Sequence, residues 1–201
     1  MKTRHRVCSA HRLNEQMKSR ITTLVALLAV SWVVMLLTHE FGHILGGWCG
    51  GATLVDYDLA PWRLPYSLHS PDPHPRLTLW AGPLVGAIFP LCVAAIVSVR
   101  AVWFVADFCL IANGGYLMLA WITGDRLLDT PRMMAAGVHP GLVAIYCLAT
   151  IGLGYVWFRA DCIAVLRPDS RTQHSRSAQT HAQDSERSKI ESTDTLQDKC
   201  E

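Results

Sequence analysis

The stretch "ITTLVALLAVSWVVMLLTHEFGHILGG", residues 21–47, decides the fold of this chain. Residues 21–37 contain no charged side chain. As a helix, an apolar run of this kind approaches the ~20 residues that cross the ~30 Å hydrocarbon core of a membrane. His39, Glu40 and His43 then interrupt the apolar pattern. An acid inside a membrane helix costs ~2.5–3.5 kcal/mol on insertion scales, so such residues usually have a function.

Three more apolar blocks follow the first one. Residues 77–99 and 141–158 contain no charged residue, and residues 101–122 contain only Asp107. A large soluble protein could bury such helices, but the polar part of this chain is too short to cover four of them. We therefore predict an all-α integral membrane protein in a lipid bilayer, with about four transmembrane helices. The predicted spans are residues 21–48, 77–99, 101–122 and 141–158.

The remaining segments flank this core, which covers residues 21–158. Residues 1–20 form a basic N-terminal arm. After the first span, Thr53, Val55 and Tyr57 alternate with other residues, which predicts a short β-hairpin-like loop. Residues 159–201 are mostly polar and contain no aromatic residue, so we expect a largely disordered cytoplasmic tail.

The distribution of charge predicts an orientation. Only Glu15 opposes six basic residues before the first span, which are Lys2, Arg4, Arg6, Arg12, Lys18 and Arg20. The positive-inside rule then places both termini of a multi-pass cell-membrane protein in the cytoplasm. The basic residues flank spans and lack interleaved aromatic residues, which argues against nucleic-acid binding. Asp107, near the start of the third span, is expected to pair with Arg100 just before that span. Met17 is a second possible start of the chain.

The polar residues of the first span have the spacing of a metal site. His39 and His43 are four residues apart, so a helix places both rings on one face. Two imidazoles in this arrangement can hold one Zn²⁺ per chain at ~2.0–2.1 Å. Glu40 projects beside them, where it can take a proton from a water that zinc activates. The alternative is a polar network that only holds helices together.

Zinc needs a third protein ligand at a matching depth. The third span runs back toward the histidine end and is followed by Asp125 and Asp129. Either carboxylate could complete the site. We favour Asp125, because it directly follows the apolar block, and we interpret Asp129 as a surface charge.

Three segments, in order, resemble the site-2 protease family of intramembrane zinc metalloproteases. They are "HEFGH" (residues 39–43), "LWAGPLVGAIFPL" (79–91) and "NGGYLMLAWITGDRLLD" (113–129). The resemblance covers about residues 21–130. It implies a zinc metalloendopeptidase that cleaves a membrane-protein substrate in or near a transmembrane segment. Glu40 would be its catalytic base, His39, His43 and Asp125 its metal ligands, and Asn113 a contact to the substrate backbone.

The chain also departs from that family. No proline lies between Asn113 and Asp125, and Arg126 stands where the family has glycine. These departures keep open a non-proteolytic membrane protein that binds a metal or a partner and retains the protease fold. The sequence leaves the oligomeric state open. If the protein is a protease, residues 51–66 could offer a strand edge to an extended substrate.

Overall fold

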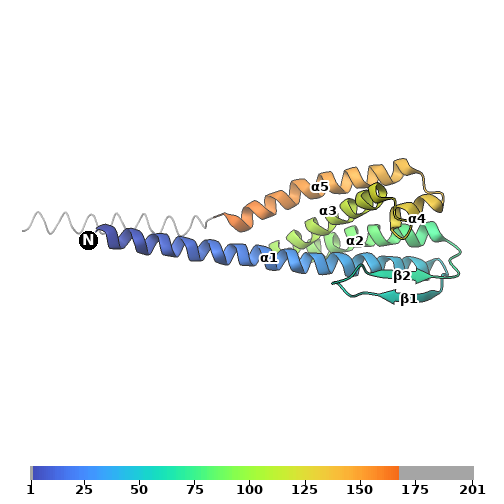
Figure 1. Ribbon diagram of the computed structural model, residues 1–201, viewed down its shortest axis with the longest axis horizontal. Coiled ribbons are helices and arrows are strands. Elements are labelled where there is room, and N and C mark those ends of the chain that lie inside the picture. Colours follow the sequence, from blue (N-terminus) through green and yellow to red (C-terminus); the bar gives the residue numbers. More distant parts are fainter. Residues whose placement is uncertain (1, 168–201) are drawn as a thin grey trace, which may run out of the picture. The chain divides into compact units, whose positions relative to one another are not determined.

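The computed structural model describes residues 2–167, with side chains from residue 14 onward. Its elements are α1 (Lys2–Cys49), β1 (Leu54–Asp58), β2 (Tyr66–His69), α2 (Pro75–Val97), α3 (Arg100–Thr123), α4 (Asp129–Ala135) and α5 (Pro140–Leu166), as Figure 1 shows. The predicted helical fold with one small hairpin is confirmed. The predicted disordered tail lies, from residue 168 onward, outside the described residues.

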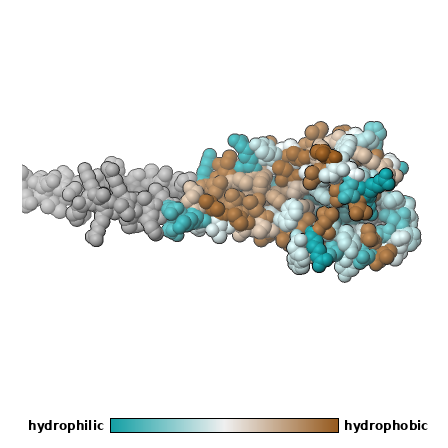
Figure 2. All heavy atoms as spheres, viewed as in Figure 1, coloured by the Kyte–Doolittle hydropathy of each residue, from teal (hydrophilic) through white to brown (hydrophobic). Residues whose placement is uncertain are grey.

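Four helices are long and apolar enough to cross a membrane. They are α2, α3, α5 and the part of α1 from Asn14 to Cys49. Large apolar side chains lie on their outer surfaces, with Ile96 83%, Ile122 75% and Leu148 68% exposed. Figure 2 shows hydrophobic side chains, coloured brown, over much of the described surface on the face in view. A surface of this size and polarity is what a lipid-facing bundle presents.

Two helices are longer than the sequence predicted. Residues 2–20, predicted as an arm, continue α1, and α5 runs on to Leu166 instead of ending at residue 158. Neither extension contains glycine or proline, so nothing in it stops a helix. Arg20 donates a hydrogen bond of 3.1 Å to the carbonyl of Leu166, which caps the end of α5.

Small residues bring α2 close to its neighbours. A Cβ atom on Gly82 would collide with the ring of His43 in α1, and one on Gly86 would lie 2.7 Å from Oδ1 of Asn113 in α3. These two glycines of α2 therefore leave room for polar side chains of α1 and α3. The pairs α1–α2, α2–α3 and α1–α3 are all in contact, and α5 packs on α3.

The hairpin lies along the C-terminal part of α1 (Figure 1). β1 and β2 are antiparallel, with Tyr57 opposite Ser67. Ser67 and His69 alternate with outward-facing residues of β2 and point to the same face. The Ser67 hydroxyl donates to Glu40, and the His69 ring lies against Gly47. The hairpin is thereby attached to the helix that carries the histidines.

Short helix α4 is fastened to two of the long helices. The Thr130 hydroxyl donates to the carbonyl of Leu117 in α3 at 2.7 Å. Arg76 at the start of α2 donates to the carbonyl of Ala136 at 2.7 Å. Met133 is fully buried in the main apolar cluster, together with Leu79, Leu117, Val138, Val143 and Cys147. These contacts fix the position of the first residue of α4.

One expected ion pair is not formed. Arg100 was predicted to pair with Asp107, but its Nε lies 3.8 Å from Oδ1 of Asp161 in α5. Asp107 is buried, whereas the Arg100 side chain is 70% exposed. The prediction used spacing within one helix and could not include α5, which brings its own carboxylate to the arginine.

Candidate metal centre

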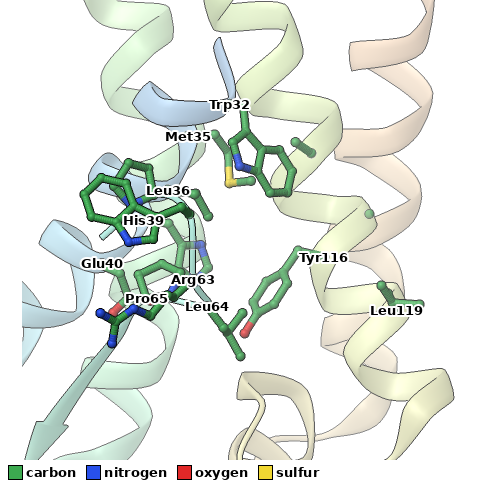
Figure 3. Close-up of a pocket in the computed structure, with 14 residues that line it drawn as sticks. Trp32, Met35, Leu36, His39, Glu40, Arg63, Leu64, Pro65, Tyr116 and Leu119 are labelled. Atoms are coloured by element: carbon green, nitrogen blue, oxygen red, sulfur yellow. The ribbon is translucent and has the colours of Figure 1, made fainter. Parts of the chain in front are cut away.

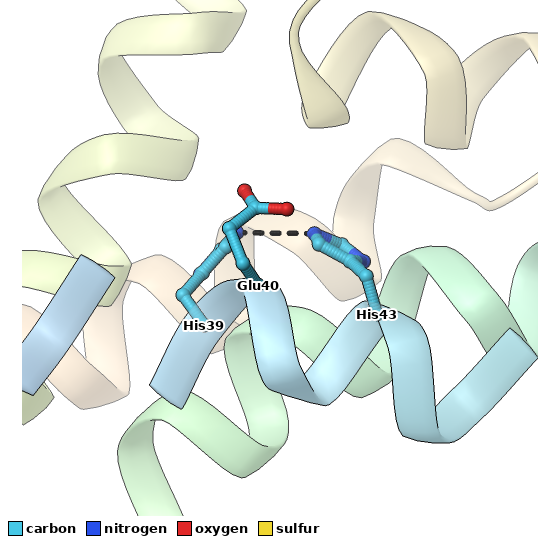
Figure 4. Close-up of side chains that lie close together, drawn as sticks. All are labelled: His39, Glu40 and His43. Carbon is cyan, nitrogen blue, oxygen red and sulfur yellow. Dashed lines mark hydrogen bonds between the residues drawn. The ribbon is translucent and has the colours of Figure 1, made fainter. Parts of the chain in front are cut away.

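The two histidines of α1 face each other. His39 and His43 are buried, and their rings meet edge to face with centroids 4.8 Å apart. Their Nε2 atoms are 3.1 Å apart. A dashed line joins the two rings in Figure 4. The prediction that both rings share one face of the helix is confirmed.

The second nitrogen of each ring is held from behind. Nδ1 of His39 lies 2.7 Å from Oδ1 of Asn113, and Nδ1 of His43 lies 2.8 Å from the carbonyl of Thr78. The Asn113 amide nitrogen donates to the carbonyl of Cys109, which fixes the orientation of the amide. Because both partners are acceptor oxygens, each Nδ1 is the donor. Each Nε2 is then the nitrogen available to a metal, an arrangement typical of metal-binding histidines.

Asp129 completes the cluster. Its Oδ2 is 2.9 Å from Nε2 of His39 and 3.1 Å from Nε2 of His43. The three atoms thus form a triangle with sides of 2.9, 3.1 and 3.1 Å. A tetrahedral metal with bonds of ~2.0–2.1 Å separates its ligand atoms by ~3.3 Å, so the triangle is close to that size. Without a metal these contacts need a proton on a ring nitrogen, and a bound ion replaces that proton.

Asp129 is held in its charged form. Burial acts to raise the pKa of this carboxyl, but attraction to His43 and hydrogen bonds with His39 and His43 outweigh burial and lower the pKa below its usual range. Arg132, one turn later in α4, has Nη1 3.9 Å from Oδ1 of Asp129. The carboxylate therefore turns one oxygen to the histidines and the other toward a cation.

Glu40 lies beside this triangle. Its carboxylate and the two histidine rings have ligand atoms within 4.8 Å of one another, and this buried group could hold a metal ion. Asp129 contacts both ring nitrogens more closely, and Glu40 accepts a hydrogen bond of 3.0 Å from Ser67. We therefore assign Asp129 to the ligand triangle and treat Glu40 as its neighbour.

The structure does not bring Asp125, the predicted third ligand, into the histidine group. Helix α3 ends at Thr123, and Gly124 adopts a left-handed conformation (φ 66°) that turns the chain. Asp125 then lies in an exposed turn, where it accepts a hydrogen bond from the backbone of Leu127. The prediction assumed that the chain after α3 continues in the direction of the helix, which would place Asp125 at the depth of the histidines. The chain instead folds back, and the buried acid is Asp129.

Asn113 also has a different place from the one predicted. It was expected to contact the substrate backbone, but its side chain is fully buried and both ends of the amide are hydrogen-bonded inside the bundle. It orients His39 from behind. Two partners were missed altogether: the carbonyl of Thr78, which has no side-chain signature, and Ser67, which only the alternation of β2 could have indicated.

Two cavities flank Glu40. The larger, of about 670 Å³, lies between α1, α3 and the loop of the hairpin. Figure 3 shows Tyr116 extending from α3 toward Leu64 in that loop. The smaller, of about 260 Å³, is bordered by β2, His43 and Asp129. Glu40 and Tyr116 border both cavities, so Glu40 lies where they meet.

No protein-family model, curated protein or solved structure matches the chain. The interpretation of the site therefore rests on the residues observed in this protein. What they provide is a buried group of two histidines and two acids, one acid bridging both rings and the other facing open cavities.

Proposed function

We propose that the protein is a zinc metalloendopeptidase of the cell membrane, which cleaves a peptide bond in or near a transmembrane segment of another membrane protein. The observation that carries the proposal is the triangle of His39, His43 and Asp129 with Glu40 beside it, in a chain whose helices are long and apolar enough to span a bilayer. The sequence resemblance to site-2 proteases points the same way.

The donor set fits zinc. Two imidazoles and one carboxylate are a usual catalytic zinc set, which leaves a fourth position open. One ion per chain would be held by His39, His43 and Asp129. Bound zinc would lower the pKa of a water molecule and polarise a peptide carbonyl. Similar donors also hold iron in oxygenases, but a buried carboxylate placed beside the ligands favours proton transfer and hence hydrolysis.

Glu40 is the proposed base. Its Oε2 accepts the hydrogen bond from Ser67, which holds the carboxylate and leaves Oε1 to accept a proton from water. Glu40 would then give this proton to the departing amine. It is only 7% exposed, so protein atoms cover most of the residue.

The hairpin is the proposed docking edge for the substrate. A helical segment cannot be attacked directly, because its carbonyls are already hydrogen-bonded along the helix. The smaller cavity is bordered by residues 64–68 and by Glu40, so the chain around β2 runs beside the base. An extended substrate segment could pair with that edge and keep its backbone in reach of Glu40. Both termini would lie in the cytoplasm under the charge rule.

The test compares Glu40→Gln with the unchanged protein. Purified from membranes, both should hold about one zinc per chain, since Glu40 is not a ligand. Quantitative proteomics of membrane proteins should reveal substrates that accumulate uncleaved only in cells with Glu40→Gln. Zinc in both proteins without any accumulating substrate would favour the non-proteolytic metal-binding alternative. A chain without zinc would contradict both.

A further inference from the structure

We infer that the larger cavity is a recognition pocket for a large apolar side chain of the substrate, next to the bond that is cut, and that Gly115 keeps part of its wall open. This inference rests on the proposed function and adds the class of substrate residue. It predicts cleavage beside leucine, methionine or aromatic residues in preference to alanine or glycine.

The position of the cavity carries the first step. His39 and Glu40 form part of its wall. A peptide whose carbonyl reaches these residues would therefore place a neighbouring side chain in the cavity. The volume of about 670 Å³ lies within the ~300–1,000 Å³ usual for ligand pockets. Apolar cavities of ~150 Å³ already accept a benzene ring, so an aromatic side chain has ample room.

The lining carries the second step. Apart from His39, Glu40 and Arg63, the wall consists of apolar or aromatic residues, namely Trp32, Met35, Leu36, Pro61, Trp62, Leu64, Pro65, Ala112, Gly115, Tyr116 and Leu119. The Arg63 side chain is 69% exposed and lies 3.7 Å from Asp58, so its charge is turned to solvent and to a partner. A polar substrate side chain would find few partners here, whereas an apolar one loses contact with water.

The third observation is the open space beside Gly115, which differs from the tightly packed surroundings of Gly114. A Cβ atom on Gly114 would collide with the Thr150 hydroxyl of α5, so Gly114 is needed for packing. A Cβ atom on Gly115 would meet nothing within 4 Å. Its open side belongs to the cavity wall. A side chain introduced at residue 115 therefore begins in open space and extends into the cavity.

A lipid acyl chain is the competing occupant. Trp32 and Leu119 of the wall are about half exposed on the outer surface, where an acyl chain could reach them. We prefer a substrate side chain because the cavity continues to His39 and Glu40, where an acyl chain has nothing to bind. The test separates the two.

The experiment measures binding, so it does not need a natural substrate. The probes are three hydroxamates, which chelate zinc, with a methyl, an isobutyl or a benzyl side chain. They are titrated by calorimetry into the zinc-loaded full chain in detergent. The benzyl compound should bind the unchanged protein at least ~10-fold more tightly than the methyl compound, as burial of several carbons requires. Gly115→Leu should reduce this preference, because the added side chain takes space from the benzyl group before it affects the methyl group.

Gly152→Leu is the matched control. Gly152 lies on α5, where a Cβ atom also meets nothing within 4 Å, but it does not border the cavity. Gly152→Leu should keep the full preference for benzyl. If Gly115→Leu does not fold, Gly115→Ala carries the test with a smaller loss of the same sign.

The outcomes distinguish the two levels of the proposal. Zinc-loaded protein that binds all three hydroxamates equally, or a preference that is undiminished in Gly115→Leu, overturns the pocket and leaves the metalloprotease intact. A lipid that co-purifies with the chain and is lost in Gly115→Leu, without any side-chain preference, assigns the cavity to lipid and also overturns the inference. A chain that binds neither zinc nor hydroxamate overturns the proposed function itself.

Discussion

Two buried polar centres lie in this bundle, and they are organised differently. At His39, His43 and Asp129, each ring nitrogen has a partner, and both Nδ1 atoms are held from behind. Nearer the other end of α3, Asp107 faces Asp161 of α5, and within the described part of the chain neither Asp107 Oδ1 nor Asp161 Oδ2 has a hydrogen-bond partner. Burial of acids alone therefore does not make a site; what distinguishes the first centre is that outer residues aim its donor atoms at one point.

The largest expected effect is the loss of zinc affinity when Asp129, the acid of the first centre, is replaced. Asp129→Asn removes the charged oxygen shared by both histidines, so zinc affinity should fall by more than the ~10–100-fold that outer residues contribute. Asp125→Asn is the matched control and should hold zinc like the unchanged protein. Competition with a zinc chelator measures both. If Asp125→Asn loses the metal and Asp129→Asn keeps it, the ligand assignment is reversed.

Loss of an outer partner should have the next largest effect. Asn113→Ala removes the acceptor of His39 Nδ1, so zinc affinity should fall ~10–100-fold while Glu40 stays in place. Ser31→Ala is the control, because Ser31 is equally buried but its hydroxyl donates to the carbonyl of Leu27 in its own helix. The same chelator competition applies. Equal affinities for the two variants would show that Asn113 has only a structural role.

The partner of the proposed base should matter less. Ser67→Ala removes one hydrogen bond to Glu40, of the kind worth ~0.5–1.5 kcal/mol, so we expect a ~2–12-fold lower turnover with unchanged zinc content. Ser70→Ala, in the loop after β2, serves as the control. Turnover is measured on a substrate found with Glu40→Gln. A loss of zinc in Ser67→Ala would mean that the hairpin supports the metal and not the base.

The smallest effect is expected at the second centre. In Asp107→Asn an amide replaces one of two facing carboxyls and can donate to Asp161. Asp107 already has a side-chain hydrogen bond with Asp161 that the amide can replace. Zinc affinity should therefore not change, and stability should change by less than about 1 kcal/mol, the net value of one hydrogen bond. Thermal unfolding in detergent reports the change. A marked loss of zinc would contradict the view that the two centres are independent.

Much of the fold could be predicted because it depends on local composition. Long uncharged blocks predict helices of membrane length, and the spacing of His39 and His43 fixes one helical face. Asp129 could not be predicted in the same way. Its position depends on where α3 ends at Gly124 and on how α4 is held by Thr130 and Arg76, and these are contacts between distant segments. The same holds for the carbonyl of Thr78, which any residue type would supply.

Five consecutive residues of α3 serve four neighbours at once. Asn113 orients His39, Gly114 admits α5, Gly115 opens the cavity, Tyr116 packs edge to face on His39, and the carbonyl of Leu117 anchors α4. These tasks lie on several sides of the helix, because successive residues of an α-helix are rotated by ~100°. A single residue inserted into α3 before Asn113 would rotate all five away from their partners together. The rotational register of this helix is thus specified far more strictly than its apolar composition suggests.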